Sequence, residues 1–345
     1  MDFTMKHFLI LSPLILILFS CKPEPPAPPA TPSLTNDGVF ILNEGNFQAG
    51  NASLDFYDLE TDTLFQGVFE LVNGRKLGDV LQSMTVVADK AYLVVNNSQK
   101  IEVVNFESLE SAGTISGLTS PRHMLAINDS IAYVSDLYAG GVHYLNLNTQ
   151  SVLNLVAVPG WTEELVRKGD QVILANYDYA YLSKIDLETN IGSSLTQVPP
   201  RGQHLLIDAN GDLWLATSAS LTDNAPGHLV HIDGETFEII SDFEFPAGQS
   251  PSRLTYNGTR DSLFWLNQGV FSMPITANEL PESPLIEEDG TFYGLGVDPV
   301  TSELFVADAI DYVQRGVILR YSAGGTLIKE FRSGVIPGSF YFKRY

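Results

Sequence analysis

Cysteine, basic residues and catalytic motifs are scarce in this sequence. A single cysteine excludes a disulfide framework and any zinc or iron–sulfur site built on paired cysteines. Lys and Arg number 19 against 41 Asp and Glu, a formal net charge of −22. That balance disfavours nucleic-acid binding and adhesion to anionic lipid through a basic patch. Phosphate-binding glycine loops, a GxSxG nucleophile elbow and the HExxH zinc motif are all absent.

One long apolar run stands at the N-terminus. Residues 1–20 contain Lys6 and then the run Phe8–Phe19, which is short for a bilayer span and has the proportions of a signal peptide. The run ends Leu18-Phe19-Ser20-Cys21, which resembles the bacterial lipobox, where the cysteine is acylated and becomes the mature N-terminus. We therefore predict a signal peptide over 1–20 and a lipid on Cys21, with an ordinary secretory signal as the alternative.

A proline-rich stretch follows the cysteine. Six prolines between Lys22 and Pro32 favour an extended, semi-rigid polyproline II segment. We predict that residues 21–36 are the lipidated cysteine and a tether, and that residues 37–345 are the folded domain. Two or more acyl chains give stable anchoring, so the expected location is the outer membrane, exposed at the cell surface.

From Val39 onward the sequence repeats itself. A short run of β-branched and aromatic residues that ends in a polar residue returns at intervals of about 40 to 50 residues, the period of a propeller blade. Turn residues precede most copies, as in Asn128-Asp129-Ser130 and Asn210-Gly211-Asp212. The seven copies are 39–43, 92–96, 131–136, 172–176, 213–217, 263–267 and 304–308.

Each copy lies between further predicted strands. An alternating strand that ends in an Asp or Asn turn follows, as in Lys184–Thr189, and another strand precedes, as in Arg122–Ile127. Four antiparallel strands per unit and seven units predict an all-β fold, a seven-bladed β-propeller. The C-terminal segment Gly338–Tyr345 matches the inner strand that the first unit lacks. We expect it to pair beside Val39–Leu42 and to close the ring, which removes open sheet edges.

Little in the sequence favours catalysis or a metal. Asp208–Asp212 has a weak likeness to a calcium loop, but a hairpin turn explains it better because the glycine is misplaced for an EF-hand. The acidic pair Glu163-Glu164 is expected to be solvated loop charge. We predict no catalytic residue, no metal site and no cofactor.

The candidate ligand site is one rim of the propeller. Loops that enter the inner strands and loops that leave the second strands share one face, where a rigid scaffold presents variable side chains. This face collects Tyr, Trp and Arg, residue types that dominate recognition sites, and Asn43, Asn96, Asn176 and Asn267 add amide groups to it. The predicted ligand-binding residues are Asn46, Phe47, Arg122, Tyr138, Trp161, Tyr177, Tyr179, Arg201, His204, Arg253, Tyr293 and Tyr312.

The opening segment suggests a family. Val39–Phe47, with its Asn-Glu-Gly-Asn-Phe ending, and Ser53–Asp58 resemble the start of YncE-like seven-bladed propeller lipoproteins, among them the cobalamin-capture propellers of TonB-dependent outer-membrane transporters. The resemblance implies a surface-exposed, non-catalytic binder that hands cobalamin, as a ligand and not a cofactor, to such a transporter.

Two alternatives stay open. Rim aromatics also suit a glycan- or protein-binding module. An enzyme, a propeller lactonase or lyase, would hold a metal by carboxylate and amide side chains of the inner strands. The predicted inner strands start at Gln82, Arg122, Glu163, Gln203, Ser252 and Tyr293, with one carboxylate among them, which disfavours it.

Overall fold

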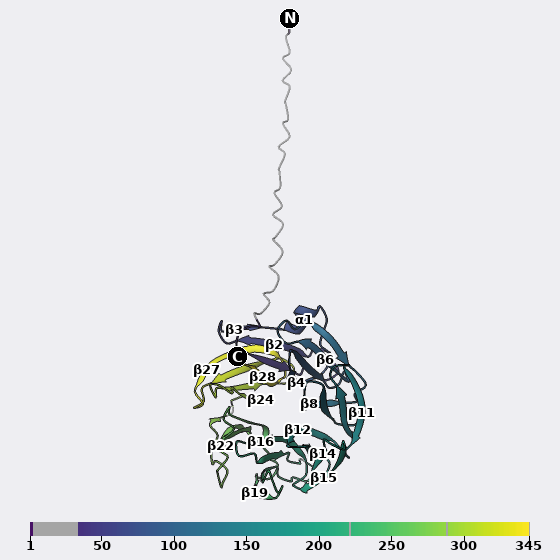
Figure 1. The fold of residues 1–345 in the computed structure, drawn as a ribbon. Helices are drawn as coiled ribbons and strands as arrows, with labels where there is room; N and C mark the ends of the chain where they lie inside the picture. Colours follow the sequence, from purple (N-terminus) through teal and green to yellow (C-terminus); the bar gives the residue numbers. More distant parts are fainter. Residues whose placement is uncertain (3–33, 221, 288, 345) are drawn as a thin grey trace. The chain divides into compact units, whose positions relative to one another are not determined.

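The described part of the chain is a ring of β-sheets. The computed structural model describes residues 1–2, 34–220, 222–287 and 289–344. Within these ranges seven four-stranded antiparallel sheets are arranged around a central axis (Figure 1). The prediction of an all-β, seven-bladed propeller is confirmed. Residues 3–33, which include most of the predicted signal peptide, Cys21 and the proline-rich stretch, lie outside the described residues.

Each blade is built from an inner, a second, a third and an outer strand. The inner strands are β28 (Pro337–Lys343), β4 (Leu81–Val87), β8 (Pro121–Ala126), β12 (Thr162–Lys168), β16 (Gly202–Ile207), β20 (Ser252–Tyr256) and β24 (Phe292–Val297). The second strands are β1 (Gly38–Asn43), β5 (Lys90–Val95), β9 (Ile131–Asp136), β13 (Gln171–Asn176), β17 (Leu213–Thr217), β21 (Ser262–Leu266) and β25 (Leu304–Asp308). The third strands are β2 (Ser53–Asp58), β6 (Lys100–Asn105), β10 (Gly141–Asn146), β14 (Tyr181–Asp186), β18 (His228–Ile232), β22 (Gly269–Pro274) and β26 (Arg315–Tyr321). The outer strands are β3 (Thr63–Phe65), β7 (Ser111–Ile115), β11 (Ser151–Ala157), β15 (Ile191–Gln197), β19 (Ile239–Glu244), β23 (Ile286–Glu287) and β27 (Leu327–Val335).

The seven sequence copies are the second strands. These strands are buried on both faces because neighbouring blades pack against them, and β1 is buried at every position. A strand buried on both sides needs a continuous apolar run instead of an alternating one. Each fully buried Leu, Ile or Phe contributes about 1.5–3 kcal/mol. This requirement, met once per blade, is what makes the repeat visible in the sequence.

The C-terminal strand closes the ring as expected. β28 pairs antiparallel with β1, with Val39 opposite Phe342 and Ile41 opposite Phe340. β28 also contacts β24 and β4, the inner strands of the two neighbouring blades. Phe340 and Phe342 pack against Phe305 of the seventh blade. The first blade therefore contains both ends of the folded domain, and the ring leaves no open inner edge there.

The polar residue that ends the repeated run ties the blades together. The buried carboxylate of Asp136 accepts hydrogen bonds from the backbone N–H groups of Thr119, Ser120, Tyr138 and Ala139, at 2.7–3.1 Å. We call the residues at this point of the blades the strand-end clamps. They connect the end of a second strand to a neighbouring loop or strand end, and comprise Asn43, Asn96, Asp136, Asn176, Thr217, Asn267 and Asp308.

One short helix interrupts the β-structure. Helix α1 (Val68–Asn73) follows β3 and buries Val68 and Phe69 in the core between the first two blades. The strand pattern does not predict it. Leu34 is 5% exposed and joins the same core, so packing of the folded unit begins ahead of residue 37. In the described residues, no helix has the length and apolar character needed to cross a membrane.

Candidate functional site

A β-bulge at the start of each inner strand shapes the central channel. Each inner strand shifts register against its second strand at the end where it enters the sheet, as between Pro121 and Met124. A bulge re-aims side chains and breaks strict alternation. Consecutive residues can therefore both face the channel, as Arg122 and His123 do, and as Gln203 and His204 do.

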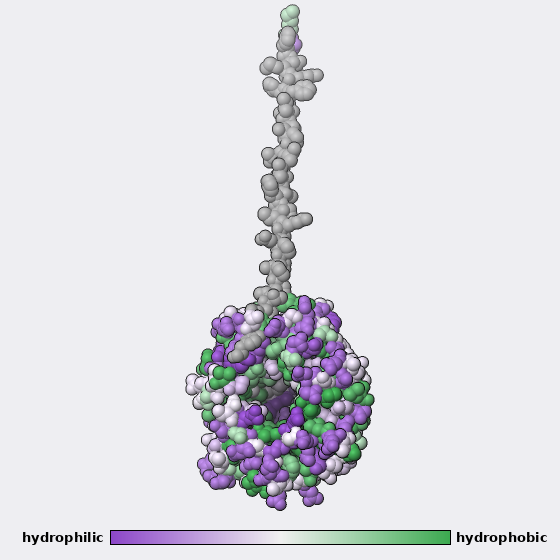
Figure 2. All heavy atoms as spheres, viewed as in Figure 1, coloured by the Kyte–Doolittle hydropathy of each residue, from purple (hydrophilic) through white to green (hydrophobic). Residues whose placement is uncertain are grey.

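The channel mouth is a polar cavity of about 400 Å³. Figure 2 shows a central hollow in the ring with hydrophilic residues inside it. The cavity is lined by Glu44, Gln82, Arg122, His123, Glu163, Gln203, His204, Ser252, Arg253, Phe292, Tyr293 and Tyr312. A second cavity of about 220 Å³ shares Gln82, His123, His204 and Arg253 with the first and adds Glu164. The two cavities are therefore adjacent, and charged side chains line both; together we call them the channel.

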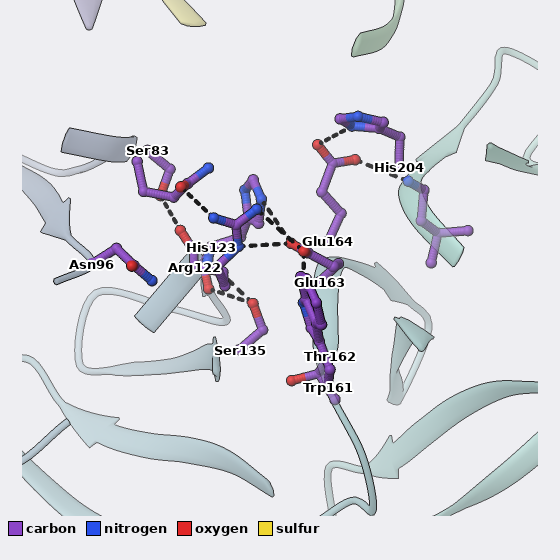
Figure 3. Close-up of polar contacts among 12 residues, drawn as sticks. Ser83, Asn96, Arg122, His123, Ser135, Trp161, Thr162, Glu163, Glu164 and His204 are labelled. Carbon is purple, nitrogen blue, oxygen red and sulfur yellow. Dashed lines mark hydrogen bonds and ion pairs between the residues drawn. The ribbon is translucent and has the colours of Figure 1, made fainter. Parts of the chain in front are cut away.

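Arg122 and Glu163 form the first ion pair of the channel. Arg122 Nε and Nη2 donate to the two carboxylate oxygens of Glu163, at 3.0 and 3.2 Å, and Nη1 donates to Gln82 Oε1 (Figure 3). The indole Nε1 of Trp161 donates to Glu163 Oε1 at 2.6 Å. Glu163 is 2% exposed, so burial has been offset by three hydrogen bonds to its carboxylate.

Glu164 and His204 form the second polar pair. His204 Nε2 accepts a hydrogen bond from the backbone N–H of Arg253 at 3.1 Å. The proton therefore sits on Nδ1, which donates to Glu164 Oε1 at 3.1 Å, while the N–H of Leu205 donates to Oε2 at 2.9 Å. Burial by itself raises the pKa of Glu164, but His204, His123 and the Leu205 amide hold it below its usual value.

Arg253, Glu44 and Tyr293 form the third cluster. Arg253 Nη2 lies 3.2 Å from Glu44 Oε1, and Tyr293 donates its hydroxyl to Glu44 Oε2 at 2.9 Å. The guanidinium of Arg253 stacks 4.6 Å from the centroid of the Tyr293 ring. Burial, supported by Glu44, raises the pKa of Tyr293 to about 12, so its hydroxyl stays a donor at neutral pH.

His123 stands among these pairs with open hydrogen-bonding capacity. Its Nε2 lies 3.7 Å from Glu163 Oε2, beyond hydrogen-bond range. Burial lowers the pKa of His123 and outweighs the opposite effect of Glu164 and Glu163. The imidazole is therefore neutral at physiological pH and offers one donor and one acceptor to the channel.

The structure corrects the expectation for Glu163-Glu164. They are not solvated loop charges: both belong to β12, and the bulge between Thr162 and Leu165 turns them into the channel walls. In a regular β-strand, two adjacent side chains point to opposite faces, so one of two adjacent glutamates is expected to face solvent. The bulge removes this alternation and lets both face the channel.

Five predicted site residues line the mouth: Arg122, His204, Arg253, Tyr293 and Tyr312. The list of expected ligand contacts missed Glu44, Gln82, His123, Glu163, Gln203, Ser252 and Phe292. Most of these residues lie at or near the start of an inner strand, and that position in the sequence pattern indicates that a side chain can face the channel.

Four other predicted residues lie in loops of the rim: Asn46 and the aromatic residues Phe47, Tyr138 and Tyr179. In the described chain, the large aromatic side chains that are strongly exposed are Phe47, Tyr138, Tyr179 and Tyr312, at 43–74%. All four lie in loops that leave second strands, so they share the rim face. Asn46 donates its side-chain amide to the backbone carbonyl of Tyr312 and thereby links two of these loops.

The remaining predicted residues belong to the fourth and fifth blades. Trp161 stacks on Tyr177 with ring centroids 4.3 Å apart, beside the stacked pair Tyr179 and Tyr181 at 5.3 Å. Together with the indole bond to Glu163, this stack connects the rim to the channel. Arg201 is placed apart from the cavity and donates from Nε to the carbonyl of Ser218 at 2.8 Å.

The amide groups expected on the rim have a different task. Asn43, Asn96 and Asn176 are buried and belong to the strand-end clamps. Asn176, for example, donates to the carbonyl of Pro159 at 2.8 Å and accepts from the N–H of Tyr179 at 3.0 Å. These amides are therefore used within the fold, and Asn176 positions the loop that carries Tyr179.

One group of potential metal ligands occurs in the described residues, and it lies outside the channel. Asp208, Asp212 and His231 place ligand atoms within 4.8 Å of one another. Asp208 accepts from the N–H groups of Asn210 and Asp212 and from the indole of Trp214, and Asp212 Oδ2 pairs with His231. The oxygens and the imidazole are already used, so this group is the hairpin turn that the sequence predicted.

Solved structures with this fold have diverse activities. A quinonprotein alcohol dehydrogenase-like protein from Bacteroides thetaiotaomicron is 14% identical, with a TM-score of 0.67, over 90% of this chain and 78% of the other. A periplasmic gluconolactonase from Pseudomonas aeruginosa is 11% identical, with a TM-score of 0.68, over 89% of this chain and 98% of the other. At these identities the likeness is one of fold alone.

Comparison with sequences gives the family. No curated protein matches this chain. The family model described as "Domain of unknown function (DUF5074)" matches residues 37–342, which is nearly the whole propeller. The chain therefore belongs to the DUF5074 family of β-propellers.

Proposed function

We propose that this protein is a non-catalytic, cell-surface lipoprotein that captures cobalamin for a TonB-dependent outer-membrane transporter. The observation that carries the proposal is the gathering of exposed aromatic rings on the rim face around a polar channel mouth. Phe47, Tyr138, Tyr179 and Tyr312 are 43–74% exposed, whereas the other large aromatics in the described chain are more protected. Exposed rings of this kind mark binding surfaces.

The size of the channel bears on the ligand. A cavity of about 400 Å³ is at the lower end for drug-sized ligands. A corrin ring with its nucleotide loop is larger, so it would lie over the mouth with its apolar face against rim rings. The amide-bearing edge of the corrin would then meet polar groups at the mouth. This arrangement uses both the aromatic and the polar features of the face.

The paired state of the channel carboxylates supports binding over catalysis. Glu44, Glu163 and Glu164 each accept at least two hydrogen bonds from neighbouring side chains or backbone. A metal-dependent lactonase needs channel carboxylates that converge on one ion, and here each faces its own cation or imidazole. Saturated pairs of this kind favour a rigid binding scaffold, and removing one partner would leave a buried charge.

The anchor is the second part of the proposal. The Leu18-Phe19-Ser20-Cys21 ending and the prolines after it suit a lipidated, tethered surface protein. Export to the surface would place the rim face beside a transporter that receives the ligand.

Calorimetric titration of rim variants tests the proposal. Full-length protein should bind cyanocobalamin, and Tyr179→Ala should weaken binding about tenfold because stacking area against the ligand is lost. Leu155→Ala is the matched control, since Leu155 is 44% exposed, as Tyr179 is, but lies on the outer strand β11. Equal loss in both variants, or no binding by the unaltered protein, would refute cobalamin capture. Binding of an oligosaccharide in its place would identify a glycan module.

A further inference from the structure

The open hydrogen-bonding groups of the channel are neutral. Gln82 is 6% exposed, and its carbonyl oxygen accepts from Arg122 while its amide nitrogen has no partner in the described chain. The side-chain amide of Gln203 and the imidazole of His123 likewise make no hydrogen bond among the described residues, although both line the cavity. Because these groups face the cavity and are not used by the protein's own hydrogen bonds, they are available to a ligand.

Each charged group, in contrast, is paired with a group of opposite charge or with a hydrogen-bond partner. Arg122 gives three hydrogen bonds to Glu163 and Gln82, and Arg253 is held by Glu44 and by the carbonyl of Tyr293. An incoming carboxylate or ammonium would compete with these ion pairs, and displacing one partner would leave the other uncompensated. Three carboxylates against two guanidinium groups also make the channel unfavourable for an anion.

We infer that the channel beneath the rim is a subsite for a neutral primary carboxamide, whose hydrogen bonds come from the open groups of Gln82, Gln203 and His123. A carboxamide presents two N–H donors and one carbonyl acceptor. Amide side chains and a neutral imidazole offer the complementary donors and acceptors without any change of charge. A site built to hydrogen-bond one group rejects an analogue that leaves its buried polar groups unpaired.

This inference deepens the proposed function and rests on it only for the identity of the whole ligand. A corrin that lies over the mouth would lower one of its peripheral amide arms into the channel. The aromatic rings of the rim would then provide apolar contact area. The channel would bind the carboxamide in preference to the carboxylate that its hydrolysis produces.

Crystals of the full-length protein soaked with propionamide, propionate or propylammonium at equal concentration test the subsite without cobalamin. We expect propionamide in the channel, within hydrogen-bond distance of Gln82, Gln203 or His123, and neither ion there. Propionate or propylammonium in the channel, or an empty channel in all three soaks, overturns the carboxamide subsite whatever the fate of cobalamin capture.

A matched pair of variants then connects the subsite to the whole ligand. Gln203→Glu replaces a neutral amide by a carboxylate of the same size and should weaken cyanocobalamin binding about tenfold. Asn154→Asp makes the same change from amide to carboxylate at an exposed position of the outer strand β11 and should leave affinity unchanged. If Gln203→Glu binds as tightly as the unaltered protein, the ligand uses the rim alone and the subsite is refuted, while capture itself stands.

Discussion

The strand-end clamps and the bulge residues of the channel occupy equivalent places in the blades but behave in opposite ways. The clamps stand at the ends of the second strands and are chemically alike, since all are Asn, Asp or Thr and all hydrogen-bond to a neighbouring loop or strand end. The bulge residues start the inner strands and differ from blade to blade: Gln82, Arg122, Glu163, Gln203, Ser252 and Tyr293.

This difference separates structure from specialisation within one chain. In every blade the end of the second strand has to be hydrogen-bonded to a neighbouring segment, so a short polar side chain recurs at the clamp. The channel is a shared space in which these six positions meet, so the blades can contribute different groups to one asymmetric site. Uniformity among blades therefore indicates a structural task, and divergence indicates a candidate site.

Removal of β28 should have the largest effect. A chain that ends at Ile336 loses the inner strand of the first blade, exposes the edge of β1, and removes Phe340 and Phe342 from Phe305. We expect loss of cooperative unfolding and association into oligomers, because an open edge pairs with other chains. Thermal melting followed by circular dichroism, with size-exclusion chromatography, measures both. A monomer that melts cooperatively would show that closure by this strand is dispensable.

A clamp and a channel residue should differ clearly in their effect on stability. Asp136→Ala leaves four backbone N–H groups and His143 without their carboxylate, so the free energy of unfolding should fall by about 3–5 kcal/mol. Gln203→Ala removes a side chain that bonds to no described residue and should change it by about 0.5 kcal/mol or less. Urea denaturation of both variants compares them. Similar losses would erase the distinction between clamp and channel.

The channel and the clamps should also affect the free energy of unfolding in different pH ranges, and these effects should be smaller than those of the alanine variants. Burial lowers the pKa of His123 below its usual 6.5, so the unfolded chain takes up this proton more readily and stability falls as pH drops below about 6.5. Burial alone would raise the pKa of Asp136, but His143 and the backbone N–H groups of Tyr138 and Ser120 lower it. Its contribution is complete above the ordinary value of 3.8 and is lost only as pH falls further.

His123→Gln should therefore flatten the stability profile between pH 7 and 5 and leave the acid limb unchanged. Asp136→Asn should act mainly on the acid limb. Urea unfolding across pH 3–8 separates the windows. The groups that face His123 are Glu163, Glu164, Arg122 and His204, and they are unaltered in both variants. An identical slope between pH 7 and 5 in His123→Gln and unaltered protein would contradict the assignment.

The fold could be predicted from the sequence because its physical requirements repeat. Strands buried on both faces need unbroken apolar runs, and these runs returned seven times, with a matching strand at the C-terminus. Helix α1 escaped prediction because six residues are too few to show a helical period.

The site could be predicted only in part. Exposed rim residues such as Tyr138 and Tyr179 follow from loop position. His123 and Glu164 could not be placed, because a bulge cannot be seen in a pattern of alternation and one residue of register decides which side chains face the channel. Ion pairs such as Arg253 with Glu44 join residues 209 positions apart, and no local signal connects them.

Calorimetric titration of the full-length protein with cyanocobalamin, repeated at several temperatures, tests the central claim most directly. We expect saturable binding of one ligand per chain, with a negative heat-capacity change because apolar rim surface is buried. Absence of heat at every temperature, together with an unshifted melting temperature at high ligand concentration, would contradict cobalamin capture.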